Sequence, residues 1–74
     1  MRPFSMHIKS KFIKYKKSKI VRINDGTSSR FNQLGILKGR LTLADRPYIV
    51  WFLEDGEIIE RYYKKGDFII KNIL

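Results

Sequence analysis

The sequence predicts an all-β protein, a small antiparallel barrel of about five strands. First, β-branched and aromatic residues dominate: eleven isoleucines, five phenylalanines and four tyrosines stand against a single alanine, Ala44. Such side chains pack well on a pleated sheet. Second, short apolar runs recur at spacings of about ten residues, separated by turn signals. Third, glycine, proline and β-branched residues recur throughout the 74 residues, which argues against a long helix.

The clearest element is a β-hairpin over residues 48–63, in which two apolar runs flank the dipeptide Asp55-Gly56. This dipeptide favours a type I′ turn, because both of its positions accept a positive φ. A two-residue loop then sets the following pairs: Glu54 with Glu57, Leu53 with Ile58, Phe52 with Ile59, and Val50 with Arg61. Since both faces of this hairpin are largely apolar, we expect it to lie centrally and to be covered on much of both sides.

The other elements are shorter and are separated by polar segments. In chain order we expect a strand over 19–23, a polar loop over 24–33, a strand over 34–43, a turn over 44–47, a turn over 64–67, and a short helical turn followed by a closing strand over 68–74. Gly35 and Gly39 interrupt the strand over 34–43, and glycine inside a strand marks a bulge or a sharp bend.

Two groups of side chains in the hairpin are candidates for a functional role. Its aromatic residues could form a base-stacking platform or belong to the core, and we favour the core because so small a domain needs them there: Trp51, Tyr62 and Tyr63. Its acidic residues gather near the tip: Glu54, Asp55, Glu57 and Glu60. We expect this tip to be solvated, because an exposed turn cannot provide the desolvation that separates the pKa values of a catalytic carboxylate pair.

The residue types present exclude several classes of site. The chain has no cysteine and a single histidine, His7, which excludes disulfides, thiolate zinc sites and histidine-rich metal sites. The acids lack the spacing of a calcium loop, no glycine-rich phosphate fingerprint is present, and Ser28-Ser29 has no recognisable base. We therefore expect no enzymatic activity, no metal and no cofactor. Without a signal sequence or an apolar run of roughly 20 residues, the chain is expected to be one soluble, cytoplasmic domain over 1–74.

Positive charge is concentrated in the first third of the chain. Residues 1–22 hold eight basic side chains and no acid, whereas residues 23–74 contribute only +1 to the net charge of +9. Such asymmetry indicates a polyanionic partner. The basic segment 1–18 is expected to lie on the barrel as a strand or an arm. Because apolar residues such as Phe12 interleave with its lysines, we favour an ordered, lysine-bearing edge with a break near Ile13 over a disordered tail.

We expect this charge to bind nucleic acid, either DNA or RNA, with little sequence preference, because lysines neutralise phosphates and release counterions. The candidate contact residues are Lys9, Lys11, Lys14, Lys16, Lys17, Lys19, Arg22, Arg30, Phe31, Lys38 and Arg40. In the polar loop, Arg30 could hold a phosphate while Phe31 stacks on a base. Alternatively, Phe31 caps the open end of the barrel, and we favour this second role.

Two other functions fit the same residues. A protein-interaction module would dock on a larger complex, or on an acidic surface of an enzyme that it inhibits. Peripheral membrane binding is expected less, because the lysine-rich segment lacks a sustained helical apolar face.

The order of these parts resembles the Src-homology-3-like small barrels over residues 19–72. Five residues could fill the positions of a KOW motif, in which a valine-rich strand and a glycine loop lead into a bend: Val21, Ile23, Gly26, Gly35 and Gly39. The opening Lys19 to Ile23, together with Asn32 and Gly35, is similar to that of electron-transport accessory barrels. The resemblance implies the fold alone, since small barrels serve many functions.

Overall fold

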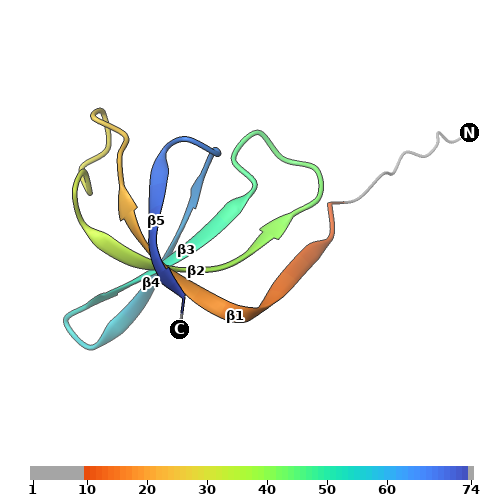
Figure 1. Ribbon diagram of the computed structural model, residues 1–74, viewed down its shortest axis with the longest axis horizontal. Coiled ribbons are helices and arrows are strands. Elements are labelled where there is room, and N and C mark those ends of the chain that lie inside the picture. The colour runs from red at the N-terminus through yellow and green to blue at the C-terminus, as the bar shows by residue number, and fades with distance from the viewer. Residues whose placement is uncertain (1–9, 74) are drawn as a thin grey trace, which may run out of the picture.

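The protein is all-β in the computed structural model, which describes residues 10–73. Five strands follow one another in the chain (Figure 1): β1 Phe12–Ile23, β2 Leu34–Leu41, β3 Tyr48–Glu54, β4 Glu57–Tyr63 and β5 Phe68–Ile73. No helix is formed within this described range, so the expected fold class of about five antiparallel strands is confirmed. The expected helical turn near the C-terminus is wrong. Residues 68–73 are extended throughout, because β1 offers them a partner strand.

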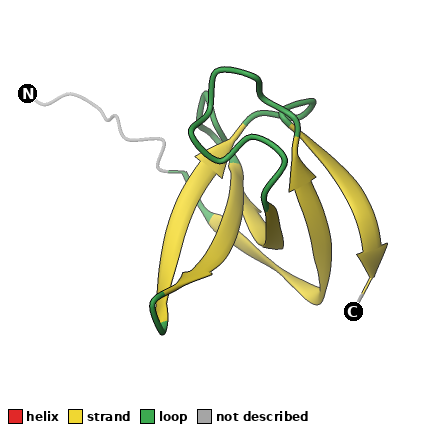
Figure 2. Ribbon diagram, turned by 90° about the vertical axis from the view of Figure 1, so that its left-hand side faces the viewer, coloured by secondary structure: helices red, strands yellow, loops and turns green. Residues whose placement is uncertain are grey.

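The strands form one antiparallel sheet in the order β4-β3-β2-β1-β5. Its strands bend around a common interior, as Figure 2 shows, but β4 and β5 remain its two edges and the sheet is not closed. This arrangement is compatible with a small SH3-like fold. Within the described residues, no helix is long and apolar enough to cross a bilayer.

The β3–β4 hairpin has the register that its turn chemistry predicts. Glu54 lies opposite Glu57, and the pairing continues without a shift to Tyr48 opposite Tyr63. The two turn residues have the positive φ values that a type I′ turn requires, 51° at Asp55 and 80° at Gly56. Local turn chemistry therefore fixes the longest uninterrupted pairing in the sheet.

Two glycines in β2, the central strand, allow close approach of neighbouring segments to the sheet backbone. A Cβ atom on Gly35 would lie 2.6 Å from Cγ1 of Val50 and 2.7 Å from the Phe52 ring, so the core packs directly on this backbone. Gly39 lies at a register shift between β2 and β3, and a Cβ there would collide with the carbonyl oxygen of Ile13. The expected bulge is confirmed at Gly39, whereas Gly35 lies in regular pairing with β1 and gives room to the core instead.

The core lies inside the curve of the sheet. Its buried members come from the first four strands: Val21, Ile23, Leu37, Val50, Phe52 and Tyr63. Four partly buried side chains pack against them: Tyr15, Tyr48, Ile59 and Phe68. The expectation that much of both faces of the hairpin is covered holds only in part. Ile49 on the outer face is 5% exposed, but this face is open toward the turn, because β4 is an edge strand. Leu53 is 73% exposed there, and Ile58 is 60% exposed.

Candidate nucleic-acid interface

The basic segment enters the sheet as the first half of β1. Phe12 to Lys14 pair with β2, whereas pairing with β5 begins only at Lys19, so the intervening residues keep a free edge. The segment is held at its start because the Lys11 amide donates to Oγ1 of Thr42 at 2.9 Å, and the Thr42 amide donates to the Lys11 carbonyl at 2.9 Å. The lysine-bearing stretch from Lys11 onward is therefore an ordered strand. Lys9 lies outside the described residues.

The break in β1 lies later in the strand than expected, over the residues that follow Lys14. The register with β2 shifts between Lys14 and Lys19 instead of near Ile13. In this irregular stretch Tyr15 packs against the core while Lys16 and Lys17 stay exposed. The shift therefore separates an aromatic ring that docks from lysines that remain in solvent.

Few of these cations are neutralised by neighbouring acids. Within the described residues, the one ion pair joins Arg30 to Glu54, and β1 itself contains no acid. Lys19 instead lies over the Tyr15 ring, with Nζ 5.2 Å from its centroid. Lys38 lies over Trp51 at 4.9 Å and donates to Oγ of Ser18 at 2.9 Å. These contacts orient the ammonium groups without cancelling their charge.

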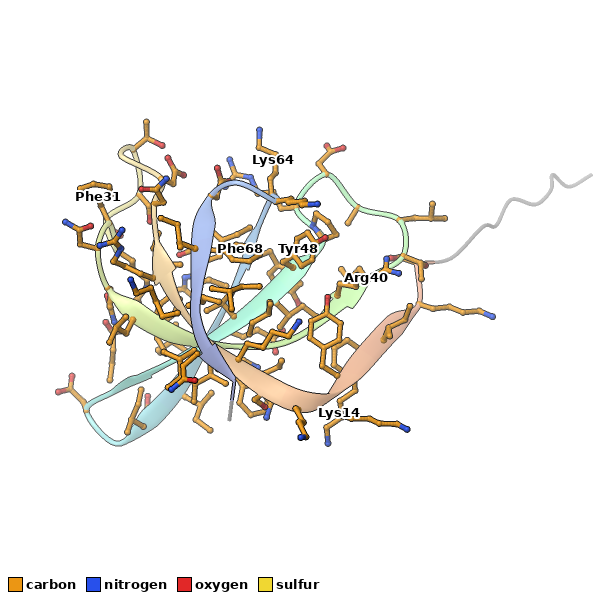
Figure 3. The ribbon with its side chains drawn as sticks, viewed as in Figure 1. Lys14, Phe31, Arg40, Tyr48, Lys64 and Phe68 are labelled. Carbon is orange, nitrogen blue, oxygen red and sulfur yellow. The ribbon has the colours of Figure 1, made fainter. Side chains whose placement is uncertain are left out.

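An aromatic cleft opens on the concave side of β1. It has a volume of about 180 Å³ and is lined by Tyr15, Lys19, Leu37, Tyr48, Lys65, Phe68 and Ile70. The rings of Tyr48 and Phe68 meet edge to face with their centroids 5.2 Å apart. Figure 3 shows Tyr48, Phe68 and Arg40 on this side, whereas Lys14 points away from it. The cleft thus combines flat rings with cations at its rim.

The charge of Arg40 influences Tyr15, which lines the same cleft. Burial raises the pKa of the Tyr15 phenol, and the nearby Tyr48 raises it further. The Arg40 guanidinium acts in the opposite direction and lowers it. Lys19 of β1 therefore contacts the Tyr15 ring directly, whereas Arg40 of β2 acts on its hydroxyl through charge alone.

The sheet divides the candidate cations between its two faces. Lys19 and Arg40 lie on the concave side with the aromatic cleft. Arg22 lies between the buried Val21 and Ile23 in β1, so it belongs to the convex side, as does Lys38 above Trp51. The candidate set is therefore not one continuous patch, and the exposed Lys16 and Lys17 lie between its two parts.

The polar loop places its two candidates apart from the cleft. The Arg30 guanidinium binds both oxygens of Glu54, at 2.6 and 2.9 Å, and lies 4.7 Å from the centroid of the Phe52 ring. Phe31 is 48% exposed and points outward from the loop (Figure 3). The side chain that covers the core at this end is therefore Arg30, and the expected capping role of Phe31 is wrong.

The hairpin aromatics also divide between the two faces. Tyr63 is buried and belongs to the core, as expected. The expected core position is wrong for Trp51 and Tyr62, because both lie on the convex face outside the core. There the indole N–H donates to Glu60 at 3.0 Å and the Tyr62 hydroxyl donates to it at 2.6 Å. These two hydrogen bonds hold the pKa of the Glu60 carboxyl below its usual range. The acidic tip is thus only partly solvated, because Glu54 and Glu60 are both engaged.

Several residues of these sites carried no local signal in the sequence. Tyr48, Lys65 and Phe68 complete the aromatic cleft; Tyr48 and Phe68 are the first residues of β3 and β5, and Lys65 lies in the turn between β4 and β5. Only the pairing of strands brings them next to Tyr15. An apolar residue just after each predicted turn was the one available hint.

Comparison with known proteins adds no assignment. No family model, no curated protein and no solved structure matches the chain. The charges, rings and pockets described above are therefore the basis for any functional conclusion.

Proposed function

We propose that the protein binds nucleic acid, DNA or RNA, with little sequence preference. In this proposal the phosphate chain follows the exposed lysines of β1, and an unpaired base enters the aromatic cleft beside Tyr15. The observation that supports it most is the juxtaposition of an ordered, acid-free cationic strand with that cleft. Cations alone would suit any polyanion, whereas rings beside them suit the flat bases of a single strand.

The energetics of such a complex follow from the exposure of the lysines. Lys14, Lys16 and Lys17 are exposed and have no acidic partner among the described residues, so they are free to replace the counterions of a strand. A base stacked on an aromatic ring adds about 1–3 kcal/mol, independent of its identity. The complex should therefore be sensitive to salt and tolerant of sequence.

The test is fluorescence anisotropy with a labelled oligothymidylate and a labelled oligouridylate across a salt series. The double variant Lys16→Gln/Lys17→Gln should weaken binding several-fold and lower the slope of log K against log salt by about 1.4, since each phosphate contact to a single strand contributes about 0.7. The matched control Lys64→Gln/Lys71→Gln removes the same charge elsewhere and should change the affinity less than twofold. Absence of binding at micromolar protein and low salt, or equal losses in both variants, would contradict the proposal.

The cleft can be tested separately from the strand. Replacing Tyr15 with leucine keeps an apolar side chain against the core but removes the stacking surface. Affinity for the single strand should fall, whereas affinity for a duplex, whose bases are already stacked, should change little. Equal losses for both would show that Tyr15 acts only through the fold.

A second candidate function is protein binding through the convex face. That face exposes a row of apolar side chains from three adjacent strands: Leu34, Ile36, Leu53, Ile58 and Tyr62. Apolar patches of this kind mark interaction surfaces. A stoichiometric protein partner that survives nuclease treatment and is lost with Leu53→Ser/Ile58→Ser, but retained with Lys16→Gln/Lys17→Gln, would favour this function over the first.

A further inference from the structure

The polar loop, the β2–β3 connection and the end of β4 enclose a second pocket, away from the lysines of β1. Its volume is about 340 Å³, and three guanidinium groups line it: Arg30, Arg46 and Arg61. Hydroxyl side chains of the loop, among them Ser29, and the single acid Asp25 complete the polar part of the wall. A pocket of this size is large enough for a small ligand.

Two of the three arginines keep their charge available. Arg30 is neutralised by Glu54, which it binds through two hydrogen bonds. Asp25 accepts hydrogen bonds from the amide and the hydroxyl of Thr27, at 3.0 and 2.7 Å, and these hold the pKa of its carboxyl low, with a smaller contribution from the charge of Arg46. Arg46 and Arg61 form no ion pair with any described residue. Within residues 10–73 the Arg61 guanidinium donates one hydrogen bond, to the Glu60 carbonyl at 2.9 Å, and its other N–H groups form none.

The hydroxyl of Tyr63 is also open to this pocket. Tyr63 is only 5% exposed as a residue and lines the pocket, and its hydroxyl forms no hydrogen bond with any described residue. Among the described residues only Nε of Arg22 is both buried and without a hydrogen-bond partner, so the Tyr63 hydroxyl is accessible. The Tyr63 phenol can therefore donate a hydrogen bond to a ligand from the wall of a cationic pocket.

The wall that faces Arg61 is fixed by backbone hydrogen bonds. Ile23 and Gln33 close the polar loop, because the Ile23 amide donates to the Gln33 carbonyl at 2.9 Å. The Asn24 amide donates to the carbonyl of Asp67 at 2.7 Å, which ties the loop to the β4–β5 turn. A ligand would thus meet a preorganised site and would not have to order the loop.

We propose that this pocket binds a phosphate monoester. The Asp25 carboxylate only partly offsets the two guanidinium groups that form no ion pair, so the wall stays positive, and planar guanidinium groups bind phosphate oxygens with two N–H groups at once. A phosphodiester inside a strand carries one charge and suits the lysines of β1 better. The same chemistry has two sources, the terminal phosphate of a strand and a free mononucleotide.

The test is an NMR titration of the ¹⁵N-labelled full chain with inorganic phosphate, adenosine monophosphate, and a short oligothymidylate with and without a 5′-phosphate. Saturable shifts of the Ser29, Arg46 and Arg61 amides by the monoesters are expected. Arg46→Gln and Arg61→Gln should each lower the affinity for the monoester by about tenfold or more, as loss of a charge-assisted hydrogen bond implies. The matched control Lys71→Gln, which removes a charge on β5, should change it less than twofold.

Two further comparisons distinguish a strand-terminal phosphate from a free mononucleotide, and this pocket from the lysines of β1. Tighter binding of the 5′-phosphorylated strand than of the 5′-hydroxyl strand assigns the pocket to strand ends, whereas equal affinities with tight adenosine monophosphate assign it to the free nucleotide. Lys16→Gln/Lys17→Gln should leave the affinity for adenosine monophosphate unchanged, so failure of the β1 proposal and failure of this one are distinguishable. Absence of saturable binding up to 10 mM monoester, about 3 kcal/mol on the 1 M scale, or shifts confined to β1, would overturn the inference.

Discussion

The two faces of the β3–β4 hairpin are almost equally apolar in sequence but differ in their surroundings near the turn. Phe52 is buried on the concave face against Tyr63, with ring centroids 6.3 Å apart, whereas its neighbour Leu53 is the most exposed large apolar side chain among the described residues. Alternation along a strand assigns side chains to a face. Which face is covered is decided by the curvature of the sheet and by the position of β4 at its edge. Three experiments test this contrast, and their expected effects run from large to small.

The largest effect is expected when the two faces are truncated in turn. Phe52→Ala should lower the free energy of unfolding by about 3–5 kcal/mol, because it removes a ring from the centre of the core. Leu53→Ala, one residue away, should change it by less than about 0.5 kcal/mol, as surface substitutions usually do. Urea denaturation followed by tryptophan fluorescence measures both. Similar losses for the two variants would mean that the convex face is also covered in solution.

A smaller effect is expected at the glycine that lets the concave face close. Gly35→Ala would place a Cβ atom within 2.6 Å of Val50, so we expect a loss of about 1–3 kcal/mol from overpacking. Gly26→Ala is the matched control, because nothing lies within 4 Å of a Cβ at that position. If both alanine variants unfold at the same urea concentration as the parent protein, β2 does not approach the core as closely as described.

The smallest effect concerns the polar bridge on the convex face. Hydrogen bonds from Tyr62 and Trp51 lower the pKa of Glu60 from its ordinary value of 4.5. A depressed pKa stabilises the fold above the ordinary value, and this stability is lost as the pH falls through the lowered one. Glu60→Gln should therefore lose less stability than the parent protein between pH 5 and 3. We expect the difference between the two proteins to be smaller than the loss caused by Gly35→Ala.

Thermal unfolding across that pH range provides the measurement. Glu57→Gln is the control for it, since the Glu57 carboxylate forms no hydrogen bond with the described residues. If Glu60→Gln and the parent protein respond to acid in parallel, the bridge does not persist in solution.

The sequence predicted the parts of the fold that depend on neighbouring residues. The turn at Asp55-Gly56 specifies its own geometry, and with it the register of the whole hairpin. The strand from Phe68 could not be told from a helical turn, because a short apolar run fits both until a partner strand is known. Pairing with β1 decides that question, and it depends on residues that are distant in the chain.

The candidate sites show the same division between local and distant information. Lysines interleaved with Phe12 and Tyr15 were enough to predict an ordered basic strand. The aromatic cleft was not predictable, because no sequence motif links its residues. Strand pairing alone brings Tyr48 and Phe68 next to Tyr15. The arginine pocket was missed for the same reason, since Arg46 and Arg61 stand in segments that meet only in the folded chain.

The hydrogen bond from Arg61 to the Glu60 carbonyl has a consequence for the behaviour of concentrated protein. An unpaired edge strand rich in isoleucine is a template on which further chains can add and grow into fibrils. On β4 a guanidinium occupies one backbone acceptor, and Glu57, Glu60 and Arg61 place charges along the same strand. The charges on β4 therefore disfavour the addition of further strands at this edge, even though the convex face beside it exposes apolar side chains.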